Sequence, residues 1–227
     1  MRIEHPFRFA FGVAVALAIG CDRLPGRPTE SERPLRPSEV TEFAVLYTEN
    51  CAGCHGADGR LGAALPLAHP VYLALVDDDT LRWVIAAGVP GTAMPGFGHA
   101  AGGPLTDAQI GVLVDGMRAR WANRDALSGE RPPPYAGDGG DAARGTAVWA
   151  ARCASCHGAD GSGGPRIGSV VDRAYLALVS DQALRTLAIA GRPDLGHPDW
   201  RGDGRAAPMT AADVSDVVAW LTARRGS

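Results

Sequence analysis

The nine residues "CAGCHGADG" at Cys51–Gly59 recur almost unchanged as "CASCHGADG" at Cys153–Gly161. A second shared stretch, "YLALV", occurs at residues 72–76 and again at 175–179. The two pairs have offsets of 102 and 103 residues, and self-similarity at a nearly fixed offset indicates a duplicated structural unit. The sequence therefore predicts two repeats, at residues 39–124 and 141–227, joined by a Pro/Gly-rich linker at 125–140.

Each nine-residue stretch contains Cys-x-x-Cys-His, the signature of covalent haem attachment, in which the histidine is held beneath the iron. Two cysteine pairs also allow a four-cysteine zinc site or redox disulfides. The histidine that directly follows each pair favours haem, so we expect two covalently bound c-type haems. The predicted attachment residues are Cys51, Cys54, Cys153 and Cys156, and the predicted proximal iron ligands are His55 and His157.

Capping residues and apolar periodicity predict an all-α fold. Ser38 or Thr41 is expected to cap a helix that ends at Asn50, and Asp141 is expected to begin the equivalent helix, which ends at Arg152. Each of these helices runs directly into a cysteine motif. Further helices are predicted within residues 77–88 and 180–191, and within 105–121 and 209–225. No alternating strand pattern occurs in either repeat.

On these motifs each repeat resembles a class I cytochrome c domain, and the chain from residue 39 onward resembles the dihaem cytochromes c of bacterial respiratory chains. The resemblance implies two tandem domains, each wrapped around a haem, with the first and last helices crossing. When the repeats are aligned, Phe43 matches Gly145 on the first helix, and Gly116 matches Trp220 on the last. The large and small partners are exchanged, which keeps the local volume filled and supports a close crossing in both repeats.

The resemblance also implies a distal methionine in a loop beyond the middle helix, usually followed by proline. In the first repeat Met94 fits this position, in "GTAMPGF", 39 residues after His55. The competing Met117 falls in the apolar stripe of the last helix, where methionine usually fills a core. His69 and His99 have no motif to support a ligand role.

The second repeat departs from the family pattern. Its one methionine, Met209, aligns with Leu105 just before the last helix, whereas His197 aligns with Met94. The sequence therefore predicts His/Met ligation of the first haem and His/His ligation of the second by His157 and His197. Met209 remains the alternative ligand, and a five-coordinate iron is a third possibility. Because thioether ligation raises the potential, we expect the first haem to have the higher potential.

The N-terminus predicts export and a membrane anchor. The apolar run Phe9–Gly20 is shorter than the roughly 20 residues that span a bilayer, but it suits a signal peptide. It ends in "AIGC", which resembles the lipobox of bacterial lipoproteins. We therefore expect a signal peptide at 1–20, lipidation of Cys21, and a Pro-rich tether at 21–38 on the periplasmic side of a bacterial membrane. Ala18 stands where leucine is more usual, which leaves simple secretion to the periplasm open.

The composition is that of an ordinary globular protein, 46% hydrophobic and 21% charged, and the net charge of -3 gives no sign of nucleic-acid binding. Two filled iron coordination spheres leave no open site for a substrate, so we expect an electron carrier or electron-transfer subunit rather than an enzyme. The resemblance implies membrane redox complexes as partners: a quinol-oxidising complex as donor, and a terminal oxidase, reductase or photosynthetic reaction centre as acceptor. A dihaem peroxidase or a haem-based sensor is the alternative, and each needs an iron with an open or displaceable site.

Overall fold

The computed structural model describes residues 29, 32–165, 167–202, 204 and 206–225. The predicted signal peptide, Cys21 and most of the predicted tether lie outside these described residues. Both repeats belong to one compact unit, Pro37–Ser227, which is separate from Met1–Arg36. None of the described helices combines the length and the apolar character that crossing a membrane requires.

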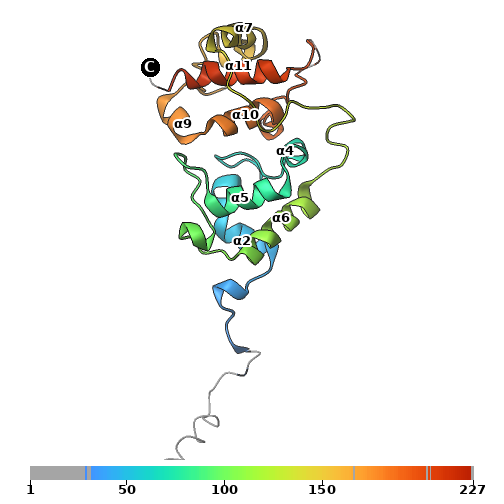
Figure 1. Ribbon diagram of the computed structural model, residues 1–227, viewed down its shortest axis with the longest axis vertical. Coiled ribbons are helices and arrows are strands. Elements are labelled where there is room, and N and C mark those ends of the chain that lie inside the picture. Colours follow the sequence, from blue (N-terminus) through green and yellow to red (C-terminus); the bar gives the residue numbers. More distant parts are fainter. Residues whose placement is uncertain (1–28, 30–31, 166, 203, 205, 226–227) are drawn as a thin grey trace, which may run out of the picture. The chain divides into compact units, whose positions relative to one another are not determined.

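The two repeats have the same order of helices (Figure 1). The first contains a 3-10 turn η3 (Pro37–Glu39), then α2 (Phe43–Asn50), α3 (Ala52–His55), α4 (Pro70–Leu75), α5 (Asp78–Ala87), η4 (His99–Ala101) and α6 (Asp107–Trp121). The second contains α7 (Ala142–Arg152), α8 (Ala154–His157), α9 (Arg173–Leu178), α10 (Asp181–Ala190), η5 (Pro193–Leu195) and α11 (Ala211–Thr222). Within the described residues the only β pairing consists of isolated bridges, so the fold is all-α, as predicted.

Most of the predicted helix starts are correct. Thr106 and Thr210 each form a capping box with the residue three positions later, and Asp141 accepts hydrogen bonds from the backbone N–H groups of Ala143 and Arg144. Asp77 and Ser180 cap α5 and α10 in the same way.

The predicted cap of α2 is wrong. The helix begins at Phe43, and its N-cap is Glu42, which makes no side-chain cap hydrogen bond. Ser38 instead lies in the turn η3. The Gln109 side chain of α6 donates to the carbonyls of Pro37 (2.8 Å) and Val40 (3.0 Å), so a tertiary contact holds the segment that leads into α2.

The first and last helices of each repeat cross at glycine. In the first repeat α2 packs on α6, and a Cβ atom on Gly116 would overlap the Phe43 ring. In the second repeat α7 packs on α11, and a Cβ atom on Gly145 would overlap the Asp216 carbonyl and lie 2.8 Å from Cβ of Trp220. The predicted exchange of large and small partners is confirmed in both repeats.

Aromatic rings fill the space around each crossing. In the second repeat Trp149 stacks on Trp220, with ring centroids 4.2 Å apart. In the first repeat Tyr47 meets Trp121 edge to face at 5.2 Å. The apolar core around the first crossing does not stop at the repeat boundary, because four buried residues of the second repeat join it: Ile189, Ala190, Trp200 and Val214.

The linker between the repeats is packed onto α10. The guanidinium of Arg185, which is only 5% exposed, donates to the carbonyls of Pro134 and Tyr135, and the Gln182 amide donates to Tyr135 as well. A buried cation needs such partners, because burial without them costs several kcal/mol. The linker backbone therefore satisfies a charge that belongs to the second repeat.

The crossing predicts opposite effects for two glycines of α6. Gly116→Ala should lower the unfolding free energy by about 1–3 kcal/mol, because the added methyl overpacks against Phe43. Gly111→Ala is the matched control on the same helix: no atom lies within 4 Å of its added Cβ, so better helix propensity should raise stability by up to about 1 kcal/mol. Denaturant unfolding of the two haem-loaded variants measures this, and equal effects would contradict the close crossing.

Candidate functional site

Each cysteine motif lies where the first helix of its repeat gives way to a single short turn, α3 or α8. Cys54 and Cys156 are exposed, whereas Cys51 and Cys153 are half-buried, and this burial raises the pKa of both thiols to about 11. The reactive sulfur atoms are thus available on both repeats, and the burial disfavours the thiolate form at the first cysteine of each pair.

An aromatic side chain of the first helix braces the end of each motif. The Tyr47 hydroxyl donates to the carbonyl of Gly56 (2.9 Å), and the indole N–H of Trp149 donates to the carbonyl of Gly158 (3.0 Å). The two glycines directly follow His55 and His157 and have positive φ angles of 85° and 81°. The crossing of the helices therefore also fixes the backbone that carries each proximal histidine.

The two histidines predicted to be proximal ligands, His55 and His157, differ in the partner of their Nδ1 atoms. Nδ1 of His55 lies 2.6 Å from the carbonyl oxygen of Leu65. A hydrogen bond at Nδ1 places the proton there and leaves the lone pair of Nε2 free for a metal. Nδ1 of His157 is buried with no hydrogen-bond partner. Burial lowers the pKa of both imidazoles, which favours the neutral form that ligates metals.

The loops that follow α5 and α10 have the same backbone pattern. The N–H of Val89 donates to the carbonyl of Met94 (3.1 Å), and the N–H of Arg192 donates to the carbonyl of His197 (3.0 Å). In both repeats the residue before the donor is a glycine with positive φ, and a Cβ atom there would overlap the loop backbone near Met94 or His197. Met94 and His197 therefore stand at equivalent places.

Met209 stands where the first repeat has Leu105. The N–H of Leu105 donates to the carbonyl of Phe97, and the N–H of Met209 donates to the carbonyl of Trp200, both at 2.8 Å. The Met209 side chain is half-buried against the apolar core. The backbone of Met209 is therefore bonded like that of Leu105, which ends the loop, and not like that of Met94.

His157 and His197 come together in the second repeat. Their ring centroids lie 5.7 Å apart, and Nδ1 of each ring is buried without a partner. Metal–imidazole bonds are about 2 Å long, so two imidazoles on opposite sides of one metal hold their ligating nitrogens about 4 Å apart, with the ring centres further apart. The pKa of His197 is lowered mainly by burial, and the neighbouring His157 lowers it further. The two imidazoles are thus close enough that both could hold one haem, and the residues present fit that group.

The two cysteine pairs are not brought together as one four-cysteine site. Among the described residues, no group of three or more His, Cys, Asp or Glu side chains is arranged to hold a metal ion.

The comparisons with known families agree with this geometry. The family described as cytochrome c oxidase, cbb3-type, subunit III matches residues 38–115. The family described as cytochrome c matches residues 142–224. The chain is a dihaem cytochrome c of class I. It accordingly binds two c-type haems covalently, one in each repeat.

Curated relatives include oxidase subunits. The chain is 34% identical over 139 residues to the cbb3-type cytochrome c oxidase subunit FixP of Azorhizobium caulinodans, covering 56% of this chain and 41% of the relative. It is 27% identical over 196 residues to subunit CcoP of Cereibacter sphaeroides, covering 78% and 58%. A 95-residue match at 33% identity to the dihydro-heme d1 dehydrogenase of Pseudomonas aeruginosa covers 40% and 19%. This dihaem cytochrome therefore spans only part of the relatives it matches.

The remaining candidate side chains differ in burial and in their partners. Met117 is buried in the core of α6, as expected, and His99 is exposed. His69, which no sequence motif supports as a ligand, is only 3% exposed. Its Nδ1 accepts from the N–H of Val71 and caps α4, while Nε2 lies 2.8 Å from the carbonyl of Ala190 in the second repeat.

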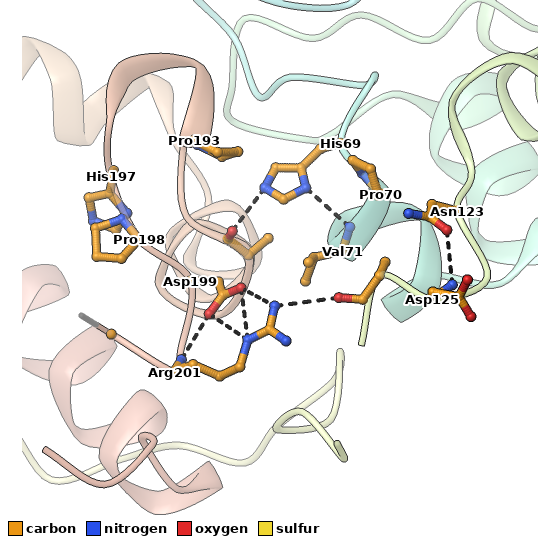
Figure 2. A pocket seen from close by; sticks show the side chains of 13 residues that line it. His69, Pro70, Val71, Asn123, Asp125, Pro193, His197, Pro198, Asp199 and Arg201 are labelled. Carbon is orange, nitrogen blue, oxygen red and sulfur yellow. Dashed lines mark hydrogen bonds and ion pairs between the residues drawn. The ribbon is translucent and has the colours of Figure 1, made fainter. Parts of the chain in front are cut away.

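A pocket of about 550 Å³ opens beside this contact (Figure 2). Figure 2 shows His69 of the first repeat and His197 of the second among the residues that line it, with Asp199 paired to Arg201. The pocket reaches His197 but none of the four motif cysteines. A histidine that joins two repeats could not be recognised from its own sequence neighbours, since its partner is 121 residues away.

The distal loop of the second repeat predicts a difference between two of its glycines. Gly191→Ala should destabilise the holoprotein by about 1–3 kcal/mol more than Gly196→Ala and disturb the spectrum of the second haem, because its Cβ would overlap the Pro198 and His197 backbone. Gly196 is the matched control, since it also has positive φ but nothing within 4 Å of an added Cβ. Unfolding and absorption spectra measure both effects. Identical behaviour of the two variants would show that the loop does not depend on this contact.

Proposed function

We propose that this cytochrome transfers electrons between membrane redox complexes on the periplasmic side of a bacterial membrane, as a carrier or as a subunit of one of them. His55 and Met94 ligate the first haem, and His157 and His197 ligate the second. A quinol-oxidising complex is the donor, and a terminal oxidase is the acceptor or the host complex. The relatives named as subunits of cbb3-type oxidases support the oxidase in this role.

The observation that carries the proposal is the equivalence of the two distal loops. Met94 and His197 each accept the same backbone hydrogen bond from the residue that follows the glycine at the end of the middle helix. In the second repeat the His197 ring also lies 5.7 Å from that of His157, the proximal histidine. Two loops closed by the same backbone hydrogen bond thus supply a thioether in one repeat and an imidazole in the other.

A haem held by two side chains in each repeat would supply one-electron transfer, and with both ligand positions filled it would offer no open site for substrate. The chain's own residues hold this arrangement rigid. The Leu65 carbonyl orients the His55 ring, and the Tyr47 and Trp149 side chains fix the backbone behind each motif. A rigid site with unchanged ligands lets the iron change charge with little rearrangement of the protein.

The difference in ligands determines which haem has the higher reduction potential. Methionine raises the reduction potential relative to a second imidazole, so the first haem is the stronger electron acceptor of the two. The hydrogen bond at Nδ1 of His55, which makes the imidazole a stronger donor to the iron, acts in the opposite sense and narrows the gap.

Lipidation of Cys21 and the Pro-rich tether that follows it complete the proposal. A lipid anchor keeps the two haem domains close to the membrane, where both the donor and the acceptor complexes lie. The Arg/Pro-rich composition of residues 22–38 suits an extended spacer.

The ligand assignment is tested by His197→Met. The ferric protein should gain a second long-wavelength methionine-to-iron charge-transfer band, and the midpoint potential of the second haem should rise toward that of the first. Met209→Leu is the matched control and should leave the spectrum and both potentials near those of the parent. If His197→Met changes neither haem while Met209→Leu removes a ligand, Met209 is the distal residue and our assignment is wrong.

Carbon monoxide separates the electron-transfer function from the sensor and peroxidase alternatives. With both coordination spheres filled, the reduced full-length protein should not bind carbon monoxide at neutral pH without denaturant, and the fully loaded protein should not turn over hydrogen peroxide. His197→Ala opens the second iron and should bind the gas, which shows that the assay detects an open site. Binding of carbon monoxide by the parent protein would favour a sensor, and peroxide turnover would favour a peroxidase.

A further inference from the structure

Arg192 takes the place in the second repeat that Val89 takes in the first, directly after the glycine that ends the middle helix. Its guanidinium forms a two-pronged pair with Asp194, with Nε–Oδ1 at 3.0 Å and Nη2–Oδ2 at 2.9 Å. The side chains are only 14% and 6% exposed, respectively. A charged and largely buried pair thus stands where the first repeat has the aliphatic Val89.

Arg192 and Asp194 belong to the second repeat, but both form hydrogen bonds with the first repeat. Nη1 of Arg192 donates to the carbonyl of Ala64, and Nη2 donates to the carbonyl of Gly62, both at 3.2 Å. Oδ2 of Asp194 accepts from the N–H of Leu61 at 3.0 Å. Donor and acceptor sites of residues 61–64 are therefore satisfied by two side chains more than 120 residues away.

The segment that receives these bonds lies against the first haem motif. The N–H of Ala64 donates to the carbonyl of Cys54, and a Cβ atom on Gly62 would overlap the backbone of Cys54 and His55. The next residue, Leu65, accepts the hydrogen bond of His55 Nδ1. Arg192 is thus one residue removed from the carbonyl that orients the proximal ligand of the first haem.

The backbone of Arg192 is hydrogen-bonded to His197, the proposed distal ligand of the second haem. Its backbone N–H donates to the carbonyl of His197 (3.0 Å), and its carbonyl accepts from the N–H of His197 (2.9 Å). The Arg192 side chain thus binds the segment next to the carbonyl that holds His55, and its backbone is paired with His197. One residue therefore adjoins a proposed ligand histidine in each repeat.

We propose that the Arg192–Asp194 pair is a shared electrostatic element that sets the reduction potentials of both haems together and holds the second haem's distal loop against the first haem's proximal side. Arg192 is a positioning residue: it acts through the segments that carry His55 and His197. The inference rests on the proposed function, since it needs both haems and His197 as a ligand.

The sign of each effect follows from Coulomb's law at a site partly removed from water. A ferric iron carries one more positive charge than a ferrous iron, so a nearby cation favours the reduced form and raises the potential. Removing the guanidinium also leaves the Asp194 carboxylate unpaired, which favours the oxidised form further. Neutralising Asp194 instead leaves the guanidinium unpaired and has the opposite effect.

The test is a potentiometric titration of the full-length, doubly loaded protein, with both haems followed in its absorption spectrum. Arg192→Gln should lower both midpoint potentials, and Asp194→Asn should raise both. The double variant should return both toward the parent values. Arg192→Lys keeps the charge but not the two-pronged geometry, so its potentials should lie closer to the parent than those of Arg192→Gln.

Arg201→Gln is the matched control. Arg201 belongs to the same loop, pairs with Asp199 at 2.5 Å and reaches the carbonyl of Ala126 in the linker at 3.4 Å. Its guanidinium lies over the Trp200 ring rather than on the first haem motif. This variant should leave the potential of the first haem near that of the parent. If Arg192→Gln fails to fold, Asp194→Asn and Arg192→Lys still test the predicted direction of the shifts in midpoint potential.

The outcomes separate this inference from the proposed function. Potentials that move only at the second haem, or that shift equally in Arg192→Gln and Arg192→Lys, would overturn the shared role and leave the pair a local structural contact. Failure of the proposed function has a different signature, because the parent protein would then lack a bis-histidine haem before any substitution at Arg192.

Discussion

The close crossing of the first and last helices is the constraint on which the rest of each repeat depends. Contact at this distance requires a residue without Cβ, and the chain meets the requirement once on α6, at Gly116, and once on α7, at Gly145. The helix of each repeat that leads into the cysteine motif is thereby fixed, and with it the aromatic side chain that hydrogen-bonds the glycine after the proximal histidine. Because the crossing is tightly packed, the first helix has little freedom to shift, and the histidine of each cysteine motif is held in one position.

The two repeats share this frame but differ in the chemistry of their distal loops. The same backbone hydrogen bond closes the loop in both, yet the loop presents Met94 in one repeat and His197 in the other. The residue after the glycine also differs, with Val89 in the first repeat and Arg192 in the second, and the Arg192 guanidinium reaches the first repeat. The two haem domains are therefore unequal at their distal loops, and both contribute side chains to the contact between them.

The contact between the repeats consists of apolar packing and buried hydrogen bonds. Ile189 and Trp200 extend the core of the first repeat, while His69 and Arg192 each use side-chain nitrogens to satisfy backbone carbonyls across the boundary. Buried carbonyls and a half-buried guanidinium are costly when unpaired, so these bonds resist separation of the domains. The linker contributes in the same way, because its Pro134 and Tyr135 carbonyls accept from the buried Arg185.

The amino-acid sequence alone determined the repeat, the all-α class, the haem-binding cysteines and most helix starts, because motif spacing, caps and apolar periodicity are local signals. It also indicated the glycine–aromatic exchange at the crossings, since aligned repeats expose such pairs. Only the tertiary structure decided that α2 begins without Ser38 or Thr41 as a cap, that His69 joins the repeats, and that Arg192 and Asp194 bond to residues 61–64. Each of these depends on partners about 70 to 130 residues away, and a hydrogen bond between distant segments leaves no periodicity for the sequence to reveal.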